Sequence, residues 1–112
     1  MNTASPRRTL TQLGRALLAL TPGHGELLRE TSRAWRSVTF SGQRCTFELR
    51  YAGIDAAIMG EALLEELAET EIHALGKVAV ADLAIKWTER QSNPLALTVA
   101  LEIITLDMPE KP

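Results

Sequence analysis

The last third of the chain carries two long alternating patterns of apolar residues, and this feature limits the possible folds most strongly. Every second position is apolar from Ala79 to Trp87, and again from Leu95 to Ile103. The intervening Ser92-Asn93-Pro94 has the composition of a loop. Alternation with a period of two is typical of strands with one buried face. The sequence therefore predicts a β-hairpin with strands of about eleven residues, long by the usual standard, and with the alternating residues as its core face.

A shorter alternating pattern lies in the first half of the chain. Val38 and Phe40 alternate with polar residues before Ser41-Gly42, and apolar residues alternate again from Cys45 to Tyr51. We expect a second hairpin that turns at Ser41-Gly42, with one apolar and one polar face. The preceding residues 26–34 fit either a helical turn or a strand.

Two segments have the periodicity of amphipathic helices. The first covers residues 9–20, with Thr9 and Gln12 as a capping box. The second runs from Ala56 to about residue 70, with Asp55 as its N-cap. We expect Ile54 to pack against Met59 at the start of this second helix. Its expected buried stripe consists of Met59, Leu63, Leu64 and Leu67.

These elements predict an α+β fold that forms a two-layer sandwich. Two β-hairpins would make a four-stranded antiparallel sheet, with the central helix packed on one face and an additional N-terminal helix. The length of 112 residues fits a single domain. We expect this domain to cover residues 9–108, between a flexible N-terminal tail, 1–8, and a C-terminal tail, 109–112. The pattern leaves the order of the strands open.

Residue types that carry chemistry are few and scattered. A pair of Cys45 with His73 is conceivable, but Cys45 falls on the apolar side of its strand, where a small buried residue is the simpler interpretation. Glu69, Glu71 and His73 alternate, yet a solvated acidic helix end explains them better than a metal site. Gly23-His24-Gly25 follows a helix and is not a phosphate loop. We therefore assign no catalytic, cofactor-binding or metal-binding residue, and a non-enzymatic role fits better than an enzyme.

Charge is distributed unevenly along the chain. Residues 1–53 hold eight arginines against three glutamates, a net charge of +5, whereas residues 54–112 have a net charge of −7. Two interpretations remain open. The basic half could bind single-stranded nucleic acid through Arg33, Trp35, Arg44 and Arg50 on the first hairpin, although the overall charge of −2 argues against it. Alternatively, the two halves complement each other within one chain or between chains.

The second face of the C-terminal hairpin is a candidate partner surface. Val78, Val80 and Ile104 are apolar residues on the side expected to face away from the core, next to Asp82. We expect this face, with Glu65 and Glu69 of the central helix, to bind a partner. A homodimer through the sheet is the simplest closed solution for a long sheet with two open edges.

The sequence thus favours a small interaction or regulatory domain that self-associates through its sheet and can bind a protein partner. One alternative is a domain that binds an acyl group or another small apolar ligand in a pocket between helix and sheet, where Asp82 or His73 would serve enzymatic turnover. Nucleic-acid binding is a second alternative. No segment reaches the length of a membrane span, and a single cysteine fits a reducing compartment. We expect a cytoplasmic protein without a cofactor.

Overall fold

The computed structural model describes residues 6–107. Its elements confirm the α+β class and the order of helix, hairpin, helix and hairpin expected from the sequence. They are, in chain order, α1 (Pro6–Ala19), β1 (Glu26–Arg36), β2 (Ser41–Ala52), α2 (Ile54–Glu69), β3 (Ala74–Leu75), β4 (Val78–Ser92) and β5 (Leu95–Thr105). Residues 26–34, which fitted two structures, belong to strand β1.

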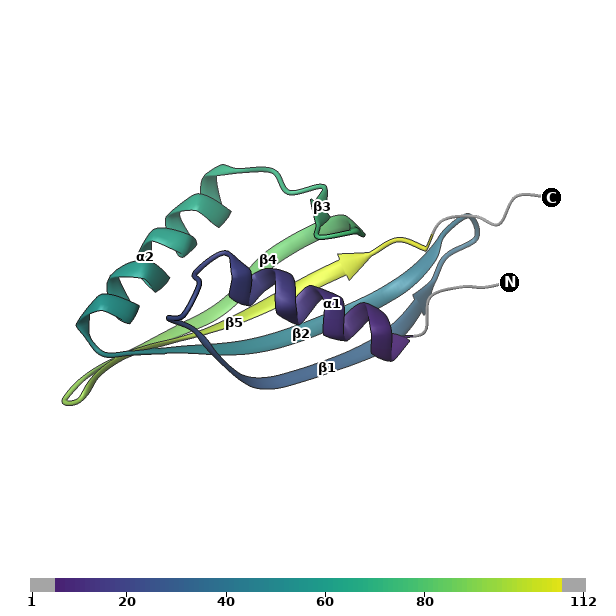
Figure 1. Ribbon diagram of the computed structural model, residues 1–112. Helices are drawn as coiled ribbons and strands as arrows, with labels where there is room; N and C mark the ends of the chain where they lie inside the picture. The colour runs from purple at the N-terminus through teal and green to yellow at the C-terminus, as the bar shows by residue number, and fades with distance from the viewer. Residues whose placement is uncertain (1–5, 108–112) are drawn as a thin grey trace.

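The strands form one long, curled antiparallel sheet in the order β1-β2-β5-β4-β3 (Figure 1). The expected four strands are therefore one too few, because Ala74–Leu75 pairs with Val78 and Ala79 as a short edge strand. Two residues are too few to produce a periodic pattern in a sequence. The two central strands, β2 and β5, come from different hairpins and pair over most of their length.

Both helices lie on the same face of the sheet, which we call the inner face (Figure 1). Glycines allow this close approach. The Gly14 position of α1 lies beside the Phe47 ring, and the Gly60 position of α2 lies against the Tyr51 ring. The opposite face carries no helix among residues 6–107, and we call it the bare face. The molecule measures 55 × 24 × 19 Å.

The core lies between the inner face and the two helices. Cys45, Phe47, Leu49 and Tyr51 of β2 are fully buried, as the alternation predicted. Their partners on β5 are equally buried and are Ile103, Leu101, Val99 and Leu97. Three of the four predicted stripe residues of α2 are buried too, namely Leu63, Leu64 and Leu67, whereas Met59 is half-buried.

Strand β4 differs from its expected pattern because two irregularities interrupt it. Its register on β5 shifts between Val80 and Asp82 and again between Ile85 and Trp87. Each extra residue reverses which side chains face the helices. Val78 and Val80 are therefore buried in the core, not on the outer face where we expected them. Trp87, expected in the core, is exposed on the bare face.

The first hairpin turns earlier than expected. Its turn consists of Ser37–Phe40, where the Ser37 N–H donates to the Phe40 carbonyl at 2.7 Å. Val38 and Phe40 are therefore exposed at the tip instead of contributing to an apolar strand face. Gly42 lies within β2, and a Cβ there would come within 1.9 Å of the Thr105 carbonyl oxygen. This glycine serves a close backbone contact and not a turn.

The helix ends also differ from the sequence-based expectations. Pro6–Arg8, expected in a flexible tail, belong to α1, and Thr9 is buried inside that helix instead of capping it. The N-cap of α2 is Gly53, with φ of 97° and no side-chain hydrogen bond, so Asp55 lies in the first turn. Ile54 is exposed there and does not cover Met59. The expected tail 109–112 lies outside the described residues.

Replacing Gly60 by alanine should destabilise the protein although alanine favours helix. A Cβ at this position would lie 2.8 Å from two ring atoms of the fully buried Tyr51. We expect Gly60→Ala to lower the free energy of unfolding by about 1–3 kcal/mol in urea denaturation, the usual cost of overpacking. Gly14→Ala is the matched control, since its Cβ would mainly displace the flexible Glu30 carboxylate at 3.3 Å. Equal stability changes in the two variants would contradict this account.

Candidate functional site

The residues with potential for catalysis lie apart. Cys45 is fully buried in the core, whereas His73 is exposed in the loop before β3 and lies 3.7 Å from Glu71. The two therefore form no nucleophile–base pair. Within residues 6–107, no group of three histidine, cysteine, aspartate or glutamate side chains is arranged to hold a metal ion.

The environment of Cys45 keeps its thiol protonated. Burial raises the pKa of Cys45 from 9.0 to about 11, because the core disfavours a thiolate. A thiol in this state is a poor nucleophile. Cys45 therefore acts as a small core residue against its neighbours on β2 and β5.

We expect Cys45 to react with thiol reagents only when the chain unfolds. Labelling with 5,5′-dithiobis(2-nitrobenzoate) near pH 8 should be much slower in buffer than in denaturant, because the thiol is both buried and protonated. The comparison of the two labelling rates by absorbance tests this. Rapid labelling of the native protein would show that the thiol is accessible and ionised.

The bare face is covered by no helix in the described part of the chain. Strand pairing aligns its side chains in rows that cross four strands. One row runs Arg33, Arg44, Ile104, Asp82, and another runs Arg29, Glu48, Ala100, Trp87. A third row places Glu26, Arg50, Thr98 and Glu89 side by side.

Charge on the bare face separates across the sheet. The β1–β2 half carries four arginines (Arg29, Arg33, Arg44, Arg50) against two glutamates. The β5–β4 half carries Asp82, Glu89 and Glu102 against one lysine. Glu102 lies 3.1 Å from Arg44 and 4.0 Å from Lys86, so it links the two halves. The unequal charge of the two halves of the chain therefore appears as a basic and an acidic side of one surface.

The residues that the sequence analysis grouped as one partner surface lie on different parts of the structure. Asp82 and Ile104 lie side by side on the bare face. Glu65 and Glu69 belong to α2, on the other side of the sheet. The four residues proposed for nucleic acid, Arg33, Trp35, Arg44 and Arg50, do share the bare face. Within that set, the indole of Trp35 donates to the Thr105 carbonyl at 3.2 Å and Arg44 is ion-paired.

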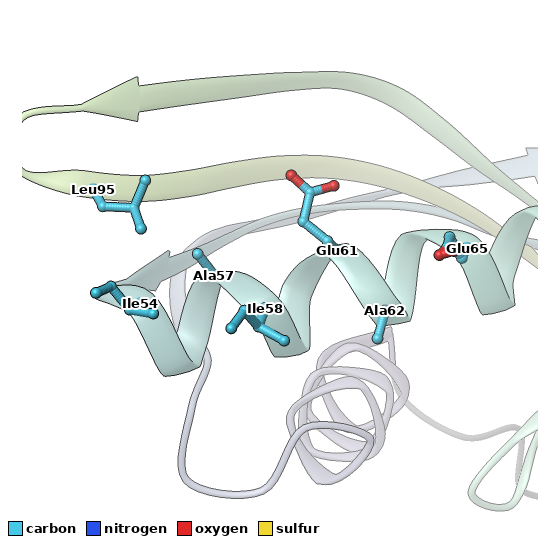
Figure 2. A pocket seen from close by; sticks show the side chains of 7 residues that line it. All are labelled: Ile54, Ala57, Ile58, Glu61, Ala62, Glu65 and Leu95. Carbon is cyan, nitrogen blue, oxygen red and sulfur yellow. The ribbon is translucent and has the colours of Figure 1, made fainter.

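A shallow apolar groove lies beside α2, with a volume of about 390 Å³. Figure 2 shows Leu95 reaching from the start of β5 towards the first turns of α2, and Glu61 extending towards β4. Ile54 and Ile58 are 67% and 61% exposed, and Glu65 lies further along the helix. We call this site the α2 groove; its lining residues are Ile54, Ala57, Ile58, Glu61, Ala62, Glu65 and Leu95.

An ion pair closes one side of the α2 groove. Arg90 of β4 donates two hydrogen bonds to the Glu61 carboxylate, at 2.6 and 2.8 Å. These bonds lower the pKa of Glu61 below its ordinary value of 4.5. The pair joins α2 to β4, whereas the body of α2 packs mainly on β2 and β5.

Sequence reasoning missed this groove for a physical reason. Ile54 and Ile58 are one helical turn apart, which is a detectable signal, but they border the buried stripe of α2 in the sequence. Leu95 starts a strand whose alternating residues are otherwise buried. Only the packing of α2 beside the start of β5 brings these three exposed side chains together.

The Glu61→Gln substitution should lower stability at neutral pH but not in acid. Because the pKa of Glu61 is lower in the folded chain, its contribution is present above the unfolded value of 4.5 and is lost as the pH falls through the folded-state pKa. We expect the difference in melting temperature between wild type and variant to disappear on acidification. Glu69→Gln on the same helix is the control, because the Arg90 ion pair is made by Glu61, and it should leave the melting temperature at neutral pH nearly unchanged.

Comparison of the chain with protein-family models, with curated proteins and with solved structures found no match. In the part of the chain that the structure describes, neither helix has the length and apolar character needed to cross a membrane. The surfaces described above are therefore the basis for inferring a role.

Proposed function

We propose that this chain is a small non-enzymatic interaction domain of the cytoplasm that forms a homodimer through its bare face. The observation that supports this most is one row of neighbouring residues across the sheet, with Arg33 at its β1 end and Asp82 at its β4 end. Both side chains are exposed. A surface with opposite charges at its two sides can complement a second copy of itself.

The symmetry of such a dimer follows from the strand order. A twofold axis parallel to the strands, between β2 and β5, places β1 of one copy over β4 of its partner and keeps each row at its own level. Arg33 then lies over Asp82 of the other copy, and Arg29 over Trp87, a favourable cation–aromatic contact. An axis across the strands would place basic strands over basic strands. Contact is weakest at the level of Glu26 and Glu89, which are both acidic.

The bare face is large enough for such an interface. Four strands of about eleven residues, spaced by about 4.8 Å with a rise of about 3.4 Å per residue, cover about 700 Å². Two copies would bury about 1,400 Å² in total, within the range of stable specific interfaces.

A charge exchange between Arg33 and Asp82 tests this arrangement. We expect wild type to form at least a dimer in sedimentation equilibrium. Arg33→Glu and Asp82→Arg should each weaken the dimer by about tenfold or more, equivalent to about 1.4 kcal/mol. The double variant should recover much of the lost affinity, because each copy again presents opposite charges at the two ends of the row.

Two further observations make this test specific. Lys77→Glu, at the exposed β3–β4 turn, also changes a charge but lies outside the interface and should leave the dimer unchanged. A double variant no better than either single variant contradicts the proposed symmetry. If the wild-type chain instead stays monomeric and binds a single-stranded oligonucleotide with a steep salt dependence, the arginines serve nucleic acid and the proposal is wrong.

A further inference from the structure

Two apolar patches lie at opposite ends of the long molecule, and neither belongs to the bare face. One is the tip of the first hairpin, residues 37–40, where Val38 is fully exposed and Phe40 is 53% exposed. The other is the α2 groove. Figure 1 shows the β1–β2 turn at one end and α2 with the β4–β5 turn at the other. Over a length of 55 Å, the two patches of one chain cannot meet.

An arginine accompanies the apolar residues of the tip. Arg36 directly precedes the turn and is exposed, whereas Arg44 further along the hairpin is paired with Glu102 and Asp107 lies beside Ser41. The turn itself is held by its backbone and by Ser37, whose Oγ accepts a hydrogen bond from the Phe40 N–H at 3.0 Å. The side chains of Val38 and Phe40 therefore contribute little to the turn, and their exposure has no structural role in the single chain.

The α2 groove has the opposite character. Its apolar part is formed by Ile54, Ile58 and Leu95, and carboxylates of Glu61 and Glu65 stand next to it. Glu61 is occupied by Arg90, whereas Glu65 has no ion-pair partner within residues 6–107. An apolar side chain followed closely by a guanidinium would match this arrangement. Two α2 helices facing each other would instead bring glutamates together.

We infer that the hairpin tip of one copy docks in the α2 groove of the next, in a head-to-tail contact. Val38 and Phe40 fill the space between Ile58 and Leu95, and Arg36 pairs with Glu65. The hairpin tip and the groove that receives it are different surfaces, so the contact is heterologous. It therefore continues into a ring or an open chain of copies. It uses neither the bare face nor its twofold axis and does not depend on the proposed dimer.

Complementation between two defective variants tests the contact. Val38→Ser combined with Phe40→Ser removes the apolar tip, and Ile58→Asp blocks the groove; all three positions are exposed, so the fold should be retained. In sedimentation velocity, the mass of wild type should grow with concentration beyond a dimer. Each variant should weaken the contact by about tenfold or more and stop this growth. Leu28→Ser, which removes an exposed leucine elsewhere, is the control and should behave as wild type.

Mixing the two variants gives the decisive result. The groove of the tip variant and the tip of the groove variant are both intact, so the mixture should form the head-to-tail contact although neither variant forms it alone. If the bare-face dimer exists, the mixture grows into long assemblies; if it does not, growth stops at one pair of unlike chains. The size of the assemblies in the mixture therefore tests the dimer and the head-to-tail contact separately. A mixture that forms no larger species than each variant forms alone, or wild type that never exceeds a dimer, overturns the head-to-tail contact.

The charged part of the contact has its own test. Arg36→Glu and Glu65→Arg should each weaken the head-to-tail growth, and the chain that carries both should recover it, since each contact again joins opposite charges. Growth that depends on Ile58 but is unaffected by the tip variant would assign the groove to another occupant, such as a basic peptide, and overturn this inference.

Discussion

The pairing of β2 with β5 is the interaction on which the rest of the structure depends. These strands lie far apart in the sequence, yet their inner side chains meet along most of their length, as in Phe47 opposite Leu101 and Leu49 opposite Val99. All four are fully or almost fully buried, and burial of each contributes about 1.5–3 kcal/mol. The helix α2 packs on both strands of this pair and against Tyr51, whereas α1 packs mainly on β1 and reaches Phe47 of β2.

The outer strands β1 and β4 differ from the central pair, because they lie beside the core but also border solvent. Register shifts in β1 and β4 change which face of the curled sheet the neighbouring side chains point to. In β4 the shifts bury Val80 and expose Trp87. Irregular edges of this kind also discourage edge-to-edge pairing with other chains. For this reason we place self-association on the faces and ends of the molecule and not on the strand edges.

The shape of the molecule separates its surfaces. Helices on one side only leave the other face of a long sheet bare, and the narrow outline keeps the hairpin tip far from the α2 groove. Basic residues gather on the β1–β2 side and at its tip, and acidic residues gather on α2 and on the β5–β4 side. Both proposed contacts follow from this separation, and both can exist at once because they use different surfaces.

Local signals in the sequence were sufficient for most elements of this fold, but not for β3 or for residues 26–34 of β1. Apolar side chains at a period of two in β2 and β5, and leucines at helical spacing in α2, identified these elements because each buries one face. The large buried side chains from Cys45 to Tyr51 and from Leu97 to Ile103 were predicted correctly for the same reason, whereas Leu95 is exposed. Charge, too, was visible as a contrast between the two halves of the chain, although its spatial meaning was not.

Only the tertiary structure determined at which residues the apolar side chains change from one face of the sheet to the other. A register shift leaves the composition of β4 unaltered, so Val78 and Val80 looked like a second face until their pairing with neighbouring strands placed them in the core. The turn at residues 37–40 depends on how β1 pairs with β2. The row that joins Arg33 to Asp82, and the groove that joins Ile58 to Leu95, bring together residues far apart in the chain. The sequence by itself determined most of the strands and both helices, because burial of one face is a local property, whereas the surfaces depend on long-range pairing that no local pattern records.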